Sequence, residues 1–146
     1  MKRVLIYITI LLFGLSLRLS AQESVKDAPH VFALMPDDIC PYLSMQQRLY
    51  IARYIHRGII DTVPNILEGK SYATFYNESD NTLGIQVTKN LHWTITAGQD
   101  TVSIVESLCA PRCAHTVFTY RLNDWRLLSV KREAVELETA EEMIEY

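Results

Sequence analysis

Two different periods of hydrophobic positions follow one another along the chain. From Ser44 to Arg57 apolar residues recur at helical spacing, and Ser44 with Gln47 three residues later forms the pattern of a capping box. Gly58 is a typical residue to end such a helix. We therefore predict a helix over residues 44–57, with one apolar face that faces the core and is made by Met45, Leu49, Ala52 and Ile55.

From Gly69 onward apolar and polar residues alternate, as they do in half-buried β-strands. Short turn-forming segments separate the predicted strands, so strands adjacent in sequence should pair antiparallel. One face of such a sheet needs cover, and the predicted helix is the available element. The fold class is therefore α+β, with an N-terminal helix packed on an antiparallel meander of about five or six strands. The candidates are Ser71–Tyr76, Leu83–Thr88, Leu91–Thr96, Thr101–Leu108, His115–Arg121 and Trp125–Val130.

Other stretches have less regular patterns. Residues 22–30 are polar and contain a proline, and we predict a flexible lead-in there. Val31–Met35 fits either a short helix or an extended segment. Residues 59–67 are ambiguous because Pro64 disfavours both a helix interior and a central strand.

The start of the chain has the three parts of a secretory signal. A basic Met1-Lys2-Arg3 precedes the uncharged, mostly apolar run Val4–Leu17, and Ala21 offers a small residue for cleavage. The run is shorter than the roughly 20 apolar residues of a bilayer span, which favours a cleaved signal over a retained anchor. We expect a signal peptide over residues 1–21, one α+β domain over 22–132 and an acidic C-terminal tail over 133–146.

Charge is distributed unevenly after the signal. Residues 1–21 hold three of the 14 basic residues and no acid, which leaves 11 bases against 17 acids. Six of these acids lie in residues 133–146, so residues 22–132 are neutral and no nucleic-acid partner is expected. The tail also carries apolar residues, and its pattern fits either an amphipathic helix on the sheet or an acidic arm for a partner.

Three cysteines, Cys40, Cys109 and Cys113, follow the signal, and export would place them where thiols tend to pair. Cys109 and Cys113 flank a proline turn between two predicted strands, which favours a disulfide at the end of a hairpin and leaves Cys40 free. The alternatives are free thiols, a pairing with Cys40 and a metal site. Three residues separate the two cysteines, whereas a redox pair has two between them at a helix start.

No motif identifies a catalytic, metal or cofactor site, and we expect none of the three. Gly69-Lys70-Ser71 resembles the end of a phosphate-binding loop, but Pro64 stands where that motif needs another glycine. Asp37-Asp38 is interpreted as a solvated pair near a helix start. Zinc-ligand spacing is absent among the four histidines, which are His30, His56, His92 and His115.

Seven aromatic residues are interleaved on the predicted strands. Core packing is the ordinary role of such residues, but those on a sheet face without cover would form a surface that recognises a protein or a glycan. The seven are Tyr72, Phe75, Tyr76, Trp93, Phe118, Tyr120 and Trp125.

Several short motifs follow one another in a characteristic order. They are Met35-Pro36-Asp37-Asp38, Pro41-Tyr42-Leu43-Ser44, Arg48-Leu49, Leu67-x-Gly69-Lys70-Ser71, Cys109-Ala110-Pro111-Arg112-Cys113, and Tyr120 before Asp124-Trp125. This order resembles a family of secreted proteins of unknown function found in Bacteroidales. The resemblance implies export in a Gram-negative anaerobe and an α+β domain, and it implies no activity and no catalytic residue.

Two further expectations come from the resemblance. Similar proteins continue beyond the meander with strand-like sequence, which implies a truncated or short variant for a chain that stops at Tyr146. In that phylum an Asp-Thr pair followed by an apolar residue resembles an O-glycosylation site, and Thr62 and Thr101 stand in such triplets.

These observations favour a non-enzymatic binding module of the periplasm or outer cell envelope, which would use a sheet face or the acidic tail. A structural envelope component and a small envelope hydrolase are the alternatives, because no nucleophile, base and orienting group occur together in a motif.

Overall fold

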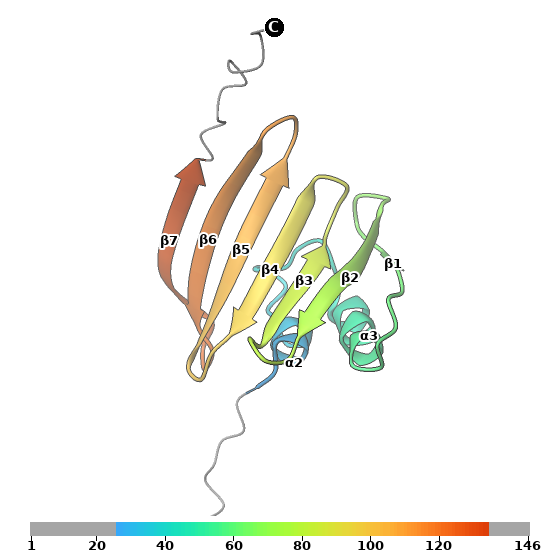
Figure 1. Cartoon of the computed structure of the whole chain (residues 1–146), viewed down its shortest axis with the longest axis horizontal. Coiled ribbons are helices and arrows are strands. Elements are labelled where there is room, and N and C mark those ends of the chain that lie inside the picture. The colour runs from blue at the N-terminus through green and yellow to red at the C-terminus, as the bar shows by residue number, and fades with distance from the viewer. Residues whose placement is uncertain (1–25, 135–146) are drawn as a thin grey trace, which may run out of the picture.

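The computed structural model describes residues 26–134, which form one antiparallel sheet with two helices on one of its faces (Figure 1). The strands stand in the sheet in their order along the chain, so each pairs with the next. The expected α+β meander is confirmed, with two helices instead of one and seven strands. The strands are β1 (Val63–Pro64), β2 (Lys70–Asn77), β3 (Thr82–Gln86), β4 (Leu91–Ala97), β5 (Thr101–Cys109), β6 (Cys113–Arg121) and β7 (Arg126–Ala134).

All six predicted strands are present, and the seventh comes from the ambiguous segment 59–67. Val63 and Pro64 of β1 pair with Ser71 and Lys70 of β2. Proline is tolerated there because β1 is an edge strand. The opposite edge is the nine-residue β7.

β7 reaches Ala134, so the first two residues of the expected tail belong to a strand. The rest of the tail and the expected signal peptide lie outside the described residues.

The longer helix, α3 (Met45–Ile55), confirms the predicted helix and its cap. The backbone N–H of Gln47 donates to Ser44 Oγ at 3.4 Å, and the backbone N–H of Ser44 donates to Gln47 Oε1 at 2.8 Å. These two bonds satisfy donors that the first turn of a helix leaves unpaired. Gly58 follows the helix with φ 70°, a left-handed conformation that suits glycine.

The shorter helix, α2 (Ala28–Ala33), contradicts the flexible lead-in expected for residues 22–30, of which 26–30 are described. Asp27 caps it by accepting the His30 N–H at 2.7 Å. The Ala28 N–H donates to Asn81 Oδ1 at 2.8 Å, which ties the helix to the β2–β3 turn. Six residues are too few to display a helical period, and burial against the sheet stabilises this helix instead.

The face that α3 turns to the core differs from the predicted one. Met45 and Leu49 are 48% and 44% exposed, so the prediction was wrong for these two residues. Ala52 is buried as predicted, together with Arg48 and Ile51. The reason is α2, which occupies the centre of the sheet and forces α3 to pack against another helix as well as against β2.

The two helices cover only part of the sheet. α2 contacts β3 and β4 while α3 contacts β2, and in Figure 1 the strands β6 and β7 lie beyond both helices. The covered part forms the core with the helices. Its larger members are Val31, Phe32, Met35, Leu43, Ile51, Leu83, Ile85, Val87, Trp93, Ile95, Val102 and Ile104.

Within the described range, no helix has the length and apolar character needed to cross a membrane.

Candidate functional site

A cavity of about 330 Å³ opens on the face of the sheet that carries the helices, beside the part that they cover. Strands β4 to β7 and the turn between β6 and β7 supply most of its lining, and the loop between α2 and α3 supplies the rest. We call this cavity the aromatic groove, and it is lined by Trp93, Phe118, Tyr120, Trp125, Ile39, Ile104, Leu127, Asp38 and Glu106.

Strand register places the groove residues on one face. Ile104 pairs with Phe118 across β5 and β6, and Trp93 pairs with Glu106 across β4 and β5. Residues directly opposite in an antiparallel pair point to the same side of the sheet. The side of β4 that faces the core therefore continues across β5 to β6. A register shift between β6 and β7 then sets Leu127 opposite Tyr120.

The aromatic rings form a continuous series. The rings of Phe118 and Tyr120 are stacked with centroids 6.4 Å apart, and those of Tyr120 and Trp125 are tilted at 6.2 Å. Trp125 has φ 54°, which is uncommon for a bulky residue. Asp124 holds this turn, because its carboxylate accepts bonds from the Arg121 guanidinium at 3.0 and 2.6 Å and from the Arg126 N–H at 3.2 Å.

Two carboxylates border the rings. Glu106 Oε2 accepts a hydrogen bond from Trp93 Nε1 at 3.2 Å and is half-buried, whereas Asp38 is exposed. No Lys, Arg or His among residues 26–134 lies within salt-bridge distance of either carboxylate. The neighbouring Asp37 pairs with Arg48 at 2.9 Å, and its side chain is nevertheless exposed, as the interpretation of Asp37-Asp38 as a solvated pair expects.

The pKa of Tyr120 is affected by the charges that border the groove. Burial raises the pKa of its hydroxyl, and the negative charges of Asp38 and Glu106 raise that pKa further. Both carboxylates therefore act on the same ring.

The aromatic residues expected to form one surface are divided between the two faces of the sheet. Tyr72 and Phe75 point to the open face, opposite the helices, because they pair with Gln86 and Gly84. Trp93 is buried, and Tyr76 lies on the helix side beside His56, with ring centroids 5.6 Å apart. The remaining three, Phe118, Tyr120 and Trp125, are half-buried in the groove.

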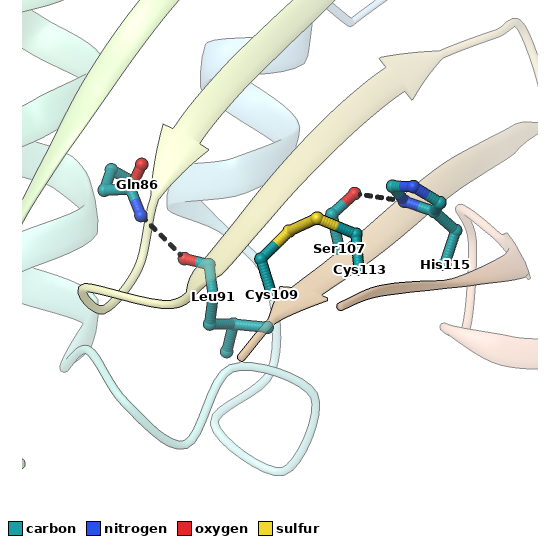
Figure 2. The surroundings of a disulfide bond; sticks show 6 residues. All are labelled: Gln86, Leu91, Ser107, Cys109, Cys113 and His115. Atoms are coloured by element: carbon teal, nitrogen blue, oxygen red, sulfur yellow. Dashed lines mark hydrogen bonds between the residues drawn. A yellow bond between two sulfur atoms is a disulfide. The ribbon is translucent and has the colours of Figure 1, made fainter. Parts of the chain in front are cut away.

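The open face is polar and rich in hydroxyl groups. One row across the strands consists of Thr82, Thr96, Ser103, Thr119 and Ser129. In another row Ser107 Oγ lies 2.7 Å from His115 Nδ1 (Figure 2). Glu133 is the strand partner of His115. Ser107 and His115 are half-buried on this face, and β5 and β6 are interior strands.

A disulfide joins Cys109 and Cys113 at the end of the β5–β6 hairpin, beside Ser107 and His115 (Figure 2). The two cysteines are strand partners with Cα atoms 4.0 Å apart. The favoured pairing is therefore confirmed, and Cys40 is a free, buried thiol whose pKa is raised by burial and lowered to a smaller extent by Arg48.

A family model for a protein of unknown function, DUF3256, matches residues 18–145. The chain belongs to the DUF3256 family. This confirms the expected membership in a family of unknown function. No curated protein matches the chain, and no solved structure matches it.

In this DUF3256 chain Gly69 ends a turn, and Lys70 and Ser71 are the first residues of β2. Asn65 Oδ1 accepts hydrogen bonds from the Gly69 N–H at 3.1 Å and the Leu67 N–H at 3.0 Å. Asn65 Nδ2 donates to the Val87 carbonyl at 2.9 Å, and Ser71 is buried at the start of β2. The glycine N–H that a phosphate would need is already donated, which agrees with the rejection of a phosphate loop.

The histidines of the DUF3256 chain are dispersed. His30 and His56 lie on the helix side, and His92 and His115 lie on the open face. No group of three or more His, Cys, Asp or Glu side chains in residues 26–134 has an arrangement that would hold a metal ion.

The two glycosylation candidates of the DUF3256 chain are both exposed. Thr62 precedes β1, and Thr101 is the first residue of β5. Their exposure leaves both hydroxyls accessible, and the O-glycosylation itself stays a prediction.

Proposed function

We propose that this DUF3256 chain is an exported, non-enzymatic binding module whose aromatic groove receives a partner in the cell envelope. The N-terminal pattern of Met1-Lys2-Arg3, the apolar run Val4–Leu17 and Ala21 supports export.

A cleaved signal predicts a mature protein that begins near Gln22. N-terminal sequencing of protein recovered from the envelope checks this, and an intact Met1 on a membrane-embedded product would contradict it.

The observation that carries the binding proposal is the aromatic groove itself. Rings at the rim of a partly covered core are well suited to binding, because they bury large areas at a small cost in side-chain entropy. Partner contacts concentrate in such pockets, where Trp and Tyr contribute most of the affinity. The positive φ of Trp125 adds support, since unusual backbone conformations cluster at functional sites.

A capture experiment tests the groove. The mature chain, residues 22–146, is immobilised and exposed to envelope extract beside two variants. Trp125→Gly removes the ring and suits the left-handed backbone at this position, so the fold should survive. Phe75→Ala removes an exposed ring from the opposite face and is the matched control.

We expect partners captured by the unmodified chain to be lost with Trp125→Gly and kept with Phe75→Ala. Circular dichroism of both variants checks that they are folded. Equal capture by all three proteins would contradict the groove as the binding site. A chain that captures no specific partner would favour the alternative of a structural envelope component.

A small envelope hydrolase is the second candidate, and the Ser107–His115 contact favours it. A serine, a histidine and Glu133 in one row have the residue types of a hydrolytic triad. The site is less suited to acyl transfer, however, because backbone N–H groups of interior strands are used in the sheet and are not free to stabilise an oxyanion. Ester turnover that disappears in Ser107→Ala would establish this activity.

A further inference from the structure

The aromatic groove has negative charge without a neutralising partner. Within residues 26–134, neither Asp38 nor Glu106 has a basic side chain within salt-bridge distance, whereas three carboxylates elsewhere, those of Asp27, Asp37 and Asp124, do. Glu106 receives a single side-chain bond, from the indole N–H of Trp93. A half-buried carboxylate retains most of its attraction for a cation, because less water screens it.

The same groove is lined by aromatic rings, and these also attract positive charge. The faces of Tyr and Trp rings carry negative potential and bind ammonium or guanidinium groups, with larger energies where water is excluded. Tyr120 is the central ring, since it contacts both Phe118 and Trp125. Both carboxylates raise the pKa of Tyr120, so the acidic and aromatic parts of the groove act at one place.

We propose that the aromatic groove holds the cationic side chain of a lysine or arginine presented by a protein partner. This inference rests on the proposed function and specifies the ligand of the same site. The carboxylates of Asp38 and Glu106 would accept its N–H groups, and the rings of Tyr120 and Trp125 would lie against its charged end.

The size of the groove agrees with this occupant. Its volume of about 330 Å³ is at the lower end of the roughly 300–1,000 Å³ typical of ligand sites. One long side chain fits such a volume better than an oligosaccharide or a drug-sized ligand does.

Charge complementarity argues against the chain's own C-terminal segment as the occupant of the groove. Residues 135–146 contain five glutamates and no lysine or arginine. An acidic segment placed beside Asp38 and Glu106 would add like charge, which is unfavourable at short range. The same argument applies to the tail of a second copy.

The test is a titration of the mature chain, residues 22–146, followed by NMR through its two tryptophan indole N–H signals. The probes are the capped tripeptides acetyl-Gly-Lys-Gly-amide and acetyl-Gly-Arg-Gly-amide. The matched neutral probe has norleucine in place of lysine, which keeps the aliphatic chain and removes the charge. N-Acetylglucosamine is included as an uncharged sugar.

We expect saturable shifts of the indole signals with the two cationic probes, and none with norleucine or the sugar. The double variant Asp38→Asn with Glu106→Gln should weaken cation binding by about tenfold, and added salt should weaken it as well. Glutamine at position 106 keeps an oxygen for the Trp93 N–H, so the groove should keep its shape. Glu78→Gln removes one negative charge at an exposed turn outside the groove, and this control should have no effect.

Three outcomes would overturn the cationic assignment: equal binding of norleucine, saturable binding of the sugar, or no saturable shift with either cationic probe. If partner capture is still lost with Trp125→Gly, the proposed function stands and only the ligand class fails. If Trp125→Gly leaves capture unchanged, the proposed function fails independently of the titration.

Discussion

Arg48 connects the longer helix to the loop that precedes it. It is 1% exposed, and its guanidinium donates to the backbone carbonyls of Met35, Cys40 and Leu43 and to Asp37 Oδ1. These bonds satisfy carbonyls that would otherwise be buried without donors. The loop that they hold carries Asp38 and Ile39 into the aromatic groove, so a buried charge positions part of the candidate site.

Arg48→Met should therefore destabilise the domain strongly. Methionine has a comparable length but no donors, and leaving several buried carbonyls unpaired should cost at least about 2 kcal/mol in the free energy of unfolding. Asp37→Asn should cost less than about 1 kcal/mol, because the Asp37 side chain is 79% exposed. Urea unfolding of the two variants measures both values. A smaller effect for Arg48→Met than for Asp37→Asn would show that the guanidinium does not hold the loop.

His92 should make stability depend on pH. It is half-buried beside Thr74, with 3.2 Å between Nε2 and Thr74 Oγ1, and burial lowers its pKa. The unfolded chain then binds a proton more readily, so the stabilising contribution is complete above the ordinary histidine pKa of about 6.5 and is lost as pH falls below it. His92→Gln should reduce the loss of the urea midpoint on acidification, whereas His30→Gln, at an exposed position, should not. The same acid response in both variants would refute the assignment.

At the scale of elements, each of the two helices covers a different part of the sheet. Ile51 on α3 is 2% exposed and belongs to the core, whereas Leu49 is 44% exposed. Ile51→Ala should lower the free energy of unfolding by about 2–5 kcal/mol, and Leu49→Ala should change it by about 0.5 kcal/mol or less. Chemical denaturation of the two variants compares them directly. Equal loss of stability would mean that α3 does not present this face to α2 and β2.

The disulfide should stabilise the β5–β6 hairpin mainly at the end where the bond lies. The bond closes a loop of only a few residues, so its contribution to global stability is about 2 kcal/mol or less. Replacing both Cys109 and Cys113 by alanine should speed amide hydrogen exchange near that end of the hairpin and leave β3 unaffected. Exchange measured by NMR distinguishes this from general loosening, in which β3 would exchange faster as well.

The sequence predicted regular elements better than it predicted how they pack. Alternation and turn residues identify the strands because each pairs with its neighbour in the chain. The capping box at Ser44 identifies α3 for the same local reason. Met45 and Leu49 were predicted wrongly because the buried face of α3 depends on α2, whose six residues show no period and whose anchor, Asn81, is 53 residues away from Ala28.

Some of the residues that carry the family resemblance have structural roles. Met35 and Leu43 provide carbonyls for Arg48, and Gly69 and Ser71 are hydrogen-bonded to Asn65. Others, which are Asp38, Tyr120 and Trp125, line the aromatic groove. None of these short motifs has a spacing typical of a known chemistry, which is why the sequence identified a family and no active site.

At the scale of the whole molecule, the candidate site is assembled from parts that are distant in sequence. Asp38 comes from the loop before α3, Glu106 from β5 and Trp125 from the turn before β7. No local spacing relates these three residues, so the sequence alone gave only a general expectation of an aromatic sheet surface. The groove lies beside the helices because they pack on β2, β3 and β4, and β6 and β7 lie beyond them (Figure 1).

The unequal edges of the sheet limit how molecules of this kind can associate strand to strand. At one edge β1 has two residues, and Pro64 lacks a backbone N–H for a further strand. At the other edge, the described part of β7 has a partner on one side only and is nine residues long. On the β1 side, the residues of β2 after Ser71 also lack a second strand partner, because β1 pairs only with Lys70 and Ser71. Pairing of β7 with β7 about a two-fold axis would use the longer continuous edge and would close at a dimer.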